Sequence, residues 1–164
     1  MNATQPGSCE ESAPLVAAGD GIIDFAPPSL GEDVTLREAA AQLVESGALG
    51  IAVLDRGGRY LGTCTLRSIV AGALPVMADT APSELLLRAS RPGAAGSRLR
   101  AALERPVTQG LDVEVPVVRL STSLPHLLIA LCRRSPVVPI VSDAGMCLLG
   151  MATLPRALRA LCAP

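Results

Sequence analysis

Aromatic residues are almost absent from this chain of 164 residues, which contains one Phe, one Tyr and no Trp. Proteins that bind single-stranded nucleic acids by base stacking need exposed aromatic side chains, so the composition disfavours that class. The formal net charge is −1, from 14 basic and 15 acidic residues. The chain therefore lacks the polycationic character that binds DNA or an anionic membrane, and we expect neither partner.

Long apolar runs and a secretory leader are also missing. No apolar run approaches the roughly 20 residues that a membrane-spanning helix needs. Residues 1–13 lack the basic start and the apolar middle of a signal peptide. We therefore expect a cytoplasmic protein. Hydrophobic residues still make up 49% of the sequence, so Leu, Val, Ile and Ala must build the core.

Metal-binding and catalytic motifs are missing as well. The five Cys residues form no Cys-x-x-Cys pair, and their odd number fits no closed disulfide framework, so we expect reduced thiols that pack as small hydrophobic residues. His126 is the only His and has no second ligand at metal-site spacing. No nucleophile elbow, paired-carboxylate motif or phosphate-binding Gly-Lys loop occurs. We expect that the chain is not an enzyme and requires no cofactor.

What the sequence does contain is one stretch that occurs twice, at an offset of 88 positions (150 − 62). Gly62 corresponds to Gly150 and Thr65 to Thr153, so an apolar run ends in Gly-x-x-Thr in both copies. The corresponding turn residues before these runs are Asp55 with Asp143 and Gly57 with Gly145. Residues 36–66 need no gap to match the second copy, which predicts two copies of one supersecondary unit.

Each copy predicts the order strand, helix, strand, strand, helix. In the first copy, Thr35 and Glu38 fit a capping box, in which each side chain accepts a hydrogen bond from the other's backbone amide at the start of a helix. Residues 50–55 and 60–64 fit two strands around a Gly-rich turn, and a second helix follows Thr65.

The predicted domain plan has four parts: a disordered tail at 1–20, a first repeat at 21–75, a helical linker at 76–110 and a second repeat at 111–164. The tail is assigned from its Ser, Pro, Gly and acidic residues. Residues 22–25 fit a short strand or turn against the core, and 113–119 fit the first strand of the second repeat.

The chain resembles a tandem pair of cystathionine beta-synthase (CBS) domains, often called a Bateman module. The resemblance is carried by Pro139-Ile140-Val141, by Leu149-Gly150-Met151-Ala152-Thr153 and by their first-copy counterparts, and it extends from about residue 22 to residue 163. It implies an α/β fold in which two pseudo-symmetric β-α-β-β-α repeats pack into one module. It also implies a homodimer, because members of the family commonly pair through the helices that follow the motif.

The resemblance further implies a ligand in the cleft between the repeats, most often an adenosine derivative such as AMP, ADP, ATP or S-adenosylmethionine. In the family, a Thr or Ser and an Asp three residues later hold the ribose and phosphate. Thr65 and Thr153 match the first position, but Ser68 and Arg156 stand where the Asp is expected. From the residues alone, a Thr at a strand–helix junction is equally a plain helix cap or part of an anion or hydroxyl site.

Further site residues follow from the same resemblance. The apolar walls would be Ile51, Ala52, Val118, Pro139 and Ile140. Arg134, with Arg133 beside it, is a candidate phosphate partner or only a charge that suits the C-terminus of a helix.

Two functions remain open on this sequence. The first is a sensor of an adenosine-type ligand, and the second is a ligand-free module for dimerisation and docking to an unknown protein partner, with decayed pockets. The two clefts are expected to differ. Ser68 can accept from one sugar hydroxyl, whereas Arg156 has no acceptor and should either attract an anion or close its cleft by pairing with a nearby acid.

Overall fold

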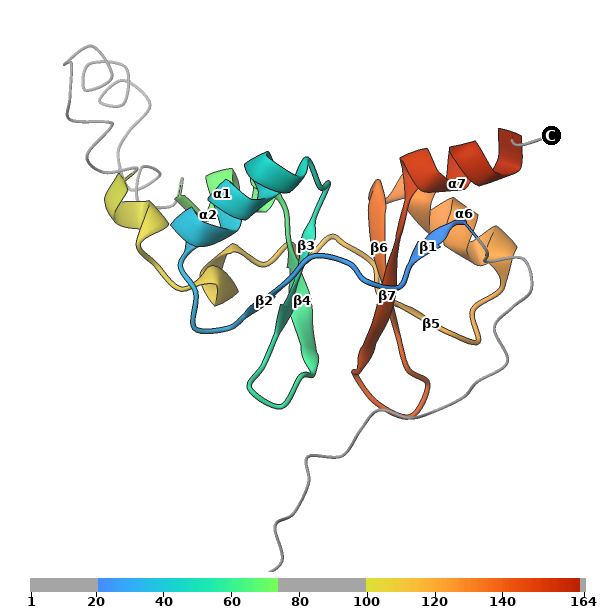
Figure 1. The fold of residues 1–164 in the computed structure, drawn as a ribbon, viewed down its shortest axis with the longest axis horizontal. Coiled ribbons are helices and arrows are strands. Elements are labelled where there is room, and N and C mark those ends of the chain that lie inside the picture. The colour runs from blue at the N-terminus through green and yellow to red at the C-terminus, as the bar shows by residue number, and fades with distance from the viewer. Residues whose placement is uncertain (1–20, 74–99, 163–164) are drawn as a thin grey trace, which may run out of the picture.

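Two small sheets lie side by side in the computed structural model, which describes residues 21–73 and 100–162 (Figure 1). The first sheet has the order β2 (Ser29–Gly31), β3 (Ile51–Leu54), β4 (Tyr60–Cys64). Its helices are α1 (Leu36–Ser46) and α2 (Leu66–Ala73), and the short 3-10 helix η1 (Val107–Gly110) packs against both. The predicted tail at 1–20 and residues 76–99 of the predicted linker lie outside the described residues.

The second sheet has the order β1 (Ile23–Asp24), β7 (Leu148–Thr153), β6 (Val137–Val141), β5 (Val118–Arg119). Its helices are α6 (Leu124–Arg133) and α7 (Leu154–Cys162). Both repeats therefore have the predicted order of strand, helix, strand, strand, helix, and the α/β fold is confirmed. The strand predicted at 113–119 is shorter than expected, because only its last two residues pair with β6.

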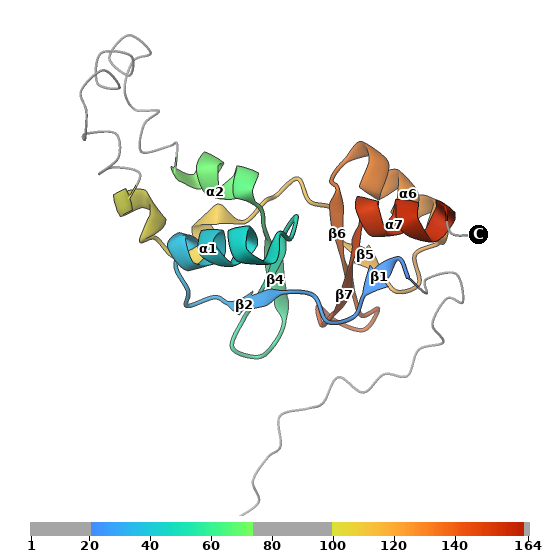
Figure 2. The ribbon, with the colours of Figure 1, turned by 45° about the horizontal axis from the view of Figure 1, so that its top comes forward.

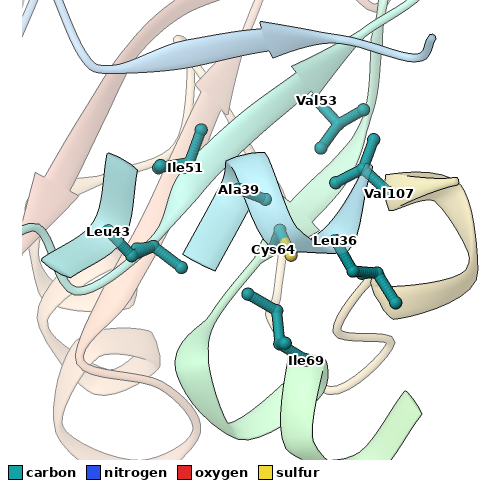
Figure 3. Close-up of a cluster of buried hydrophobic side chains, with 8 residues drawn as sticks. All are labelled: Leu36, Ala39, Leu43, Ile51, Val53, Cys64, Ile69 and Val107. Carbon is teal, nitrogen blue, oxygen red and sulfur yellow. The ribbon is translucent and has the colours of Figure 1, made fainter. Parts of the chain in front are cut away.

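The first core shows why these residues form a helix on a sheet (Figure 3). The predicted capping box is present at the start of α1, where Thr35 N donates to Glu38 Oε2 at 2.7 Å and Glu38 N donates to Thr35 Oγ1 at 3.3 Å. The helix then places one apolar face on β3, β4 and α2. The buried residues of this core are Leu36, Ala39, Leu43, Ile51, Val53, Cys64, Ile69 and Val107. Each large side chain buried in this way stabilises the fold by about 1.5–3 kcal/mol.

The two repeats exchange their leading segments. The segment with β1 pairs antiparallel with β7 of the second repeat and then runs on to β2 of the first, as both views show (Figure 1, Figure 2). The exchange is reciprocal, since Ile23 pairs with Ala152 and Leu111 forms the equivalent bridge with Cys64. Both partners are displaced by 88 positions (111 − 23 and 152 − 64). The short strand predicted at 22–25 is confirmed.

The Gly of each Gly-x-x-Thr motif makes room for this crossing. A Cβ atom on Gly150 would lie 2.7 Å from Asp24 O and 2.7 Å from Ile23 Cγ2. A Cβ atom on Gly62 would lie 3.0 Å from Leu111 Cδ1. A side chain at either position would therefore push against the leading segment. The motif Gly is explained by close approach of the backbone rather than by a special dihedral angle.

The register of the two hairpins corrects the gapless alignment. Ala52 pairs with Thr63 in the first hairpin, and Pro139 pairs with Met151 in the second. Thr63 and Met151 are 88 positions apart (151 − 63), but Ala52 and Pro139 are 87 apart (139 − 52), so the predicted alignment is wrong across the first strand. The helix–strand connection is 47–50 in the first repeat and 134–136 in the second, and the hairpin turn is 55–59 against 142–147. Compared with the first repeat, the second repeat has one residue fewer before its first hairpin strand and one residue more in its hairpin turn.

The repeats share a third core between their hairpins, made of Ala52, Tyr60, Val137, Val141 and Met151. Tyr60 N donates to Met146 O of the opposite turn at 2.7 Å. The Tyr60 hydroxyl shares a 2.7 Å hydrogen bond with Thr63 Oγ1 inside this core. The two sheets are thus joined by apolar packing and by backbone hydrogen bonds.

The cysteines depart from the expectation of buried, reduced thiols. Cys64 is fully buried and free, as expected. Cys132 and Cys162 are free but exposed, and Cys147 is held in a disulfide bond. Cys132 and Cys162 are therefore free as expected but not buried, and Cys147 departs from the expectation of a free thiol. For Cys132 and Cys162 the apolar flanks were misleading, because flanking residues do not fix the face of a helix on which a side chain lies.

Substituting the motif glycines should test the crossing. Gly150→Ala should lower the free energy of unfolding by about 1–3 kcal/mol, since the new methyl group meets backbone atoms that cannot move independently. Gly62→Ala should cost less, because it meets the flexible end of Leu111. Gly31→Ala is the matched control, with no atom within 4 Å of its Cβ position. Urea denaturation measures all three, and equal stabilities would contradict a steric role for the crossing.

Alkaline pH should unfold the protein through two buried groups. Burial raises the pKa of Cys64 from 9.0 to about 11 and the pKa of Tyr60 from 10.0 to about 12. Both groups are neutral when protonated, and folding raises their pKa values. Burial of the neutral forms therefore contributes fully to stability below pH 9, and this contribution is lost as the pH rises to about 12. The expected loss is about 2–3 kcal/mol per group. The sequence contains 14 Arg and no Lys, so no amine side chain obscures this window.

Urea denaturation between pH 8 and pH 12 measures this loss. Tyr60→Phe is the informative variant, because it should remove the step between pH 10 and pH 12 and leave the Cys64 step at lower pH. A free energy of unfolding that stays flat from pH 9 to pH 12 would rule out the assignment.

Candidate functional site

Two cavities lie between the repeats, one beside each motif Thr. The first has a volume of about 260 Å³ and is lined from the segments 48–49, 65–67, 112–115 and 134–137. The second has a volume of about 320 Å³ and is lined mainly from the segments 24–28, 46–50 and 151–156. In each cavity, one repeat supplies the motif and the start of a helix, and the other supplies its helix–strand connection. Each cavity is also lined by residues that precede the first strand of a repeat, 112–115 in the first cavity and 24–28 in the second.

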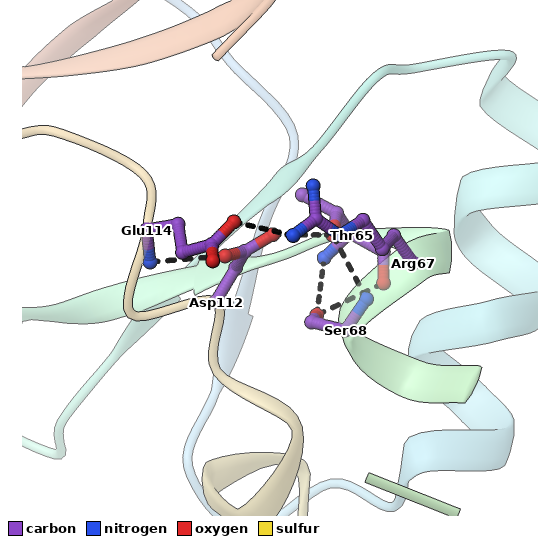
Figure 4. A network of polar contacts seen from close by, with 5 residues as sticks. All are labelled: Thr65, Arg67, Ser68, Asp112 and Glu114. Carbon is purple, nitrogen blue, oxygen red and sulfur yellow. Dashed lines mark hydrogen bonds and ion pairs between the residues drawn. The ribbon is translucent and has the colours of Figure 1, made fainter. Parts of the chain in front are cut away.

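Thr65 both caps a helix and faces the first cavity (Figure 4). Its hydroxyl accepts from Ser68 N at 3.1 Å and donates to Asp112 Oδ2 at 2.9 Å. The structure confirms that Thr65 is a helix cap, and its role in a ligand site stays a prediction.

Ser68 does not line the first cavity. Its side chain is 7% exposed, accepts from Thr65 N at 2.9 Å and lies 2.6 Å from Gly110 O, to which it donates. The Ser68 hydroxyl is thus engaged by the protein backbone on both its donor and its acceptor side. The structure gives Ser68 a capping role and not the ligand contact that the resemblance implies.

Asp112 is the acidic residue that sequence reasoning missed. It lines the first cavity, and its two carboxylate oxygens accept from the Thr65 hydroxyl and, at 3.1 Å, from Glu114 N. The available signal was its place 88 positions after Asp24, which lines the second cavity.

Three further charged residues line the first cavity. Arg67 and Glu114 form an ion pair between exposed side chains, and such a pair contributes only about 0–1 kcal/mol, so a ligand anion can compete for the Arg. Arg134 lines the opposite side from the second repeat, and its role as a phosphate partner stays a prediction. A cavity with cations and an acceptor suits a ligand that carries both a phosphate and hydroxyl groups.

The second cavity has the same plan with different chemistry. Arg156 N donates to Thr153 Oγ1 at 3.4 Å, so Thr153 also caps its helix. Arg156 Nη1 donates to Ile23 O at 3.1 Å and lies 3.8 Å from Asp24 Oδ2. This is the pairing with a nearby acid that the sequence offered as one outcome for Arg156.

The predicted apolar wall residues do not line either cavity. Ile51, Ala52, Val118, Pro139 and Ile140 pack instead into the interior of the sheets. Their place is taken by residues that precede the strands, namely Ala48 and Leu49 in one repeat and Pro136 and Val137 in the other. The cavities thus lie at the entry to the hairpin strands rather than over their centres.

No cluster of three His, Cys, Asp or Glu side chains suited to a metal ion occurs within residues 21–73 and 100–162. In the same part of the chain, no helix is both long enough and apolar enough to cross a membrane.

Comparison with known proteins identifies the family of the first repeat. Residues 22–76 match the model of the CBS domain family. The first repeat of the chain is therefore a CBS domain. None of the curated proteins compared with the chain matches it.

Solved structures extend the likeness in fold over both repeats of the chain. A CBS domain protein from Streptococcus pneumoniae TIGR4 has a TM-score of 0.66 and 17% identity over 90% of this chain and 84% of that one. A CBS domain-containing protein of unknown function from Kribbella flavida DSM 17836 has a TM-score of 0.63 and 22% identity over 88% and 98%. CbpB, in complex with c-di-AMP, has a TM-score of 0.63 and 13% identity over 90% and 85%. At these identities the likeness shows the paired fold.

Proposed function

We propose that the chain is a regulatory module that senses an adenosine-type nucleotide in the cavity beside Thr65. The observation that carries the proposal is the convergence there of a hydroxyl, a carboxylate and two Arg side chains from both repeats, namely Thr65, Asp112, Arg67 and Arg134. A ligand that touches both repeats can change how they pack, which is the physical basis of regulation. The nucleotide complex of CbpB, a structural neighbour, supports this ligand class.

The lining favours a nucleotide over a simple anion. Apolar residues at 49, 115, 136 and 137 offer a surface for a base, while Arg67 and Arg134 suit a phosphate. The volume of about 260 Å³ lies just below the range of about 300–1,000 Å³ that is typical for drug-sized ligands. It therefore suits a mononucleotide such as AMP better than a larger ligand.

A ligand-free module for dimerisation and protein docking is the second candidate function. The ion pair between Arg156 and Asp24 favours it, because it occupies the polar groups of the second cavity. On either reading we propose a homodimer in the cytoplasm with no catalytic activity. The helices α2 and α7 leave Val70, Leu158 and Leu161 more than half exposed, and apolar surface of this kind usually marks an interface.

Nucleotide binding is tested by a thermal-shift screen with AMP, ADP, ATP, S-adenosylmethionine and c-di-AMP, followed by calorimetry. At least one of these ligands should raise the melting temperature, because a ligand that binds only the folded state stabilises it. We expect one nucleotide per chain. Arg134→Gln should weaken binding about tenfold or more, since a hydrogen bond to a charged group contributes about 1.5–3 kcal/mol.

Arg133→Gln is the matched control for this screen, because Arg133 is the exposed neighbour of Arg134 and does not line the cavity. It should leave the affinity unchanged. If none of the five ligands changes the melting temperature, the sensor is refuted and the docking module is the better account.

Dimer formation is tested by light scattering at micromolar concentration. The wild-type mass should be twice the 16.8 kDa of one chain. Leu158→Glu should shift the mass to that of a monomer, because a charge on the buried face of an interface costs several kcal/mol. Val113→Glu is the control, since Val113 is 94% exposed and lies outside both helices. A monomeric wild type would contradict the homodimer.

A further inference from the structure

Each cavity contains one acid at an equivalent position of the leading segment. Asp112 lines the first cavity and Asp24 the second, and they are 88 positions apart (112 − 24). This is the offset that separates the motif residues Thr65 and Thr153. The acid that both motifs lack three positions after the Thr is therefore present in space, delivered by a different part of the chain.

Backbone pairing holds both acids in the same way. The residue before each Asp pairs with the motif strand, as Leu111 does with Cys64 and Ile23 with Ala152. Asp112 N then donates to Thr63 O at 2.8 Å. The position of the carboxylate is thus set by strand pairing and not by a mobile loop.

One oxygen of each carboxylate is fixed locally. Asp112 Oδ1 accepts from Glu114 N at 3.1 Å, and Asp24 Oδ1 accepts from Ala26 N, also at 3.1 Å. The other oxygen is directed at the motif of the opposite strand. Asp112 Oδ2 accepts from the Thr65 hydroxyl at 2.9 Å, whereas Asp24 Oδ2 lies 3.8 Å from Arg156 Nη1.

The neighbouring acid Glu114 is a poorer candidate for reading a ligand. Its side chain is 64% exposed and is paired with Arg67 at the surface. Asp112 is partly buried and is held against Thr65. Ser68 is excluded because its hydroxyl is bound to the backbone of the protein.

We infer that Asp112 is the carboxylate that accepts the sugar hydroxyls of a ribonucleotide in the cavity beside Thr65. The inference rests on the proposed function and names the group that gives it specificity for ribose. An ionised carboxylate accepts two hydrogen bonds at once, which suits the vicinal hydroxyls of ribose. The equivalent acid of the second cavity faces a guanidinium, so of these two cavities only the first combines its acid with the hydroxyl of the motif Thr.

Calorimetry with AMP and 2′-deoxy-AMP tests the inference on the full chain. Wild type should bind AMP about tenfold more tightly than 2′-deoxy-AMP, because the deoxy sugar lacks one of the two hydroxyls. Asp112→Asn keeps the size of the side chain and one acceptor for Thr65, but it loses the charge and the second acceptor. This variant should bind AMP about tenfold more weakly and lose the preference for ribose.

Two controls separate recognition from folding. Asp33→Asn removes an exposed acid that pairs with Arg56 outside both cavities, and it should leave both affinities unchanged. Ser68→Ala should keep the ribose preference even if it lowers stability. The ratio of the two affinities is read from folded protein, so a general loss of stability does not change it.

The outcomes are distinguishable. An Asp112→Asn variant that keeps the wild-type preference for AMP over 2′-deoxy-AMP overturns the inference and leaves nucleotide sensing intact. Wild-type protein that binds neither nucleotide overturns the proposed function and the inference together. Loss of the ribose preference in Ser68→Ala but not in Asp112→Asn would assign the role to the motif position instead.

Discussion

The whole arrangement depends on the reciprocal crossing of the leading segments over the motif strands. Each repeat donates the residues before its first strand to the sheet of the other repeat, where they pair next to the motif Gly. The crossing favours glycine at positions 62 and 150, because a side chain there would meet the donated segment. It also brings an Asp from each segment to the edge of a cavity. Fold and site chemistry thus share one structural cause.

Because the two repeats are pseudo-symmetric, the differences between the two cavities can be traced to single residues. Both cavities contain a Thr that caps a helix. Both also contain an Asp whose carboxylate accepts a hydrogen bond from the backbone amide two residues later. The residue three positions after the Thr decides the outcome. Ser68 turns into the protein and leaves Asp112 facing the cavity, whereas Arg156 approaches Asp24 and donates to the leading segment. One cavity keeps an acceptor, and the other holds an ion pair.

Local patterns predicted the elements but not their exchange between repeats. The capping box at Thr35, the apolar helix faces and the paired Gly-x-x-Thr motifs were sufficient for the α/β repeat. The crossing could not be predicted, because β1 has two residues and a segment that short has no periodicity. The one-residue shift of the first hairpin strand was hidden because helix and motif kept the offset of 88 on either side of it.

The predicted residues that line the cavities come from the two motifs and, at Arg134, from the end of α6. Thr65, Thr153, Arg134 and Arg156 line the cavities, while the predicted wall residues lie inside the cores. Apolar strand residues satisfy a core as well as a ligand, so sequence alone does not separate the two. Asp112 was missed because it lies outside the motif in sequence and reaches Thr65 only through strand pairing. The offset of 88 positions between Asp24 and Asp112 points to a shared role only when both residues are seen to line equivalent cavities.

A crystal structure of the chain with AMP tests the central claim most directly. The account predicts one AMP per chain in the cavity beside Thr65, with both ribose hydroxyls within hydrogen-bonding distance of the Asp112 carboxylate. The ion pair between Arg156 and Asp24 should remain closed in the second cavity. A ribose bound instead beside Thr153, or held in the first cavity without contact to Asp112, would contradict the claim that the crossing segment supplies the acid.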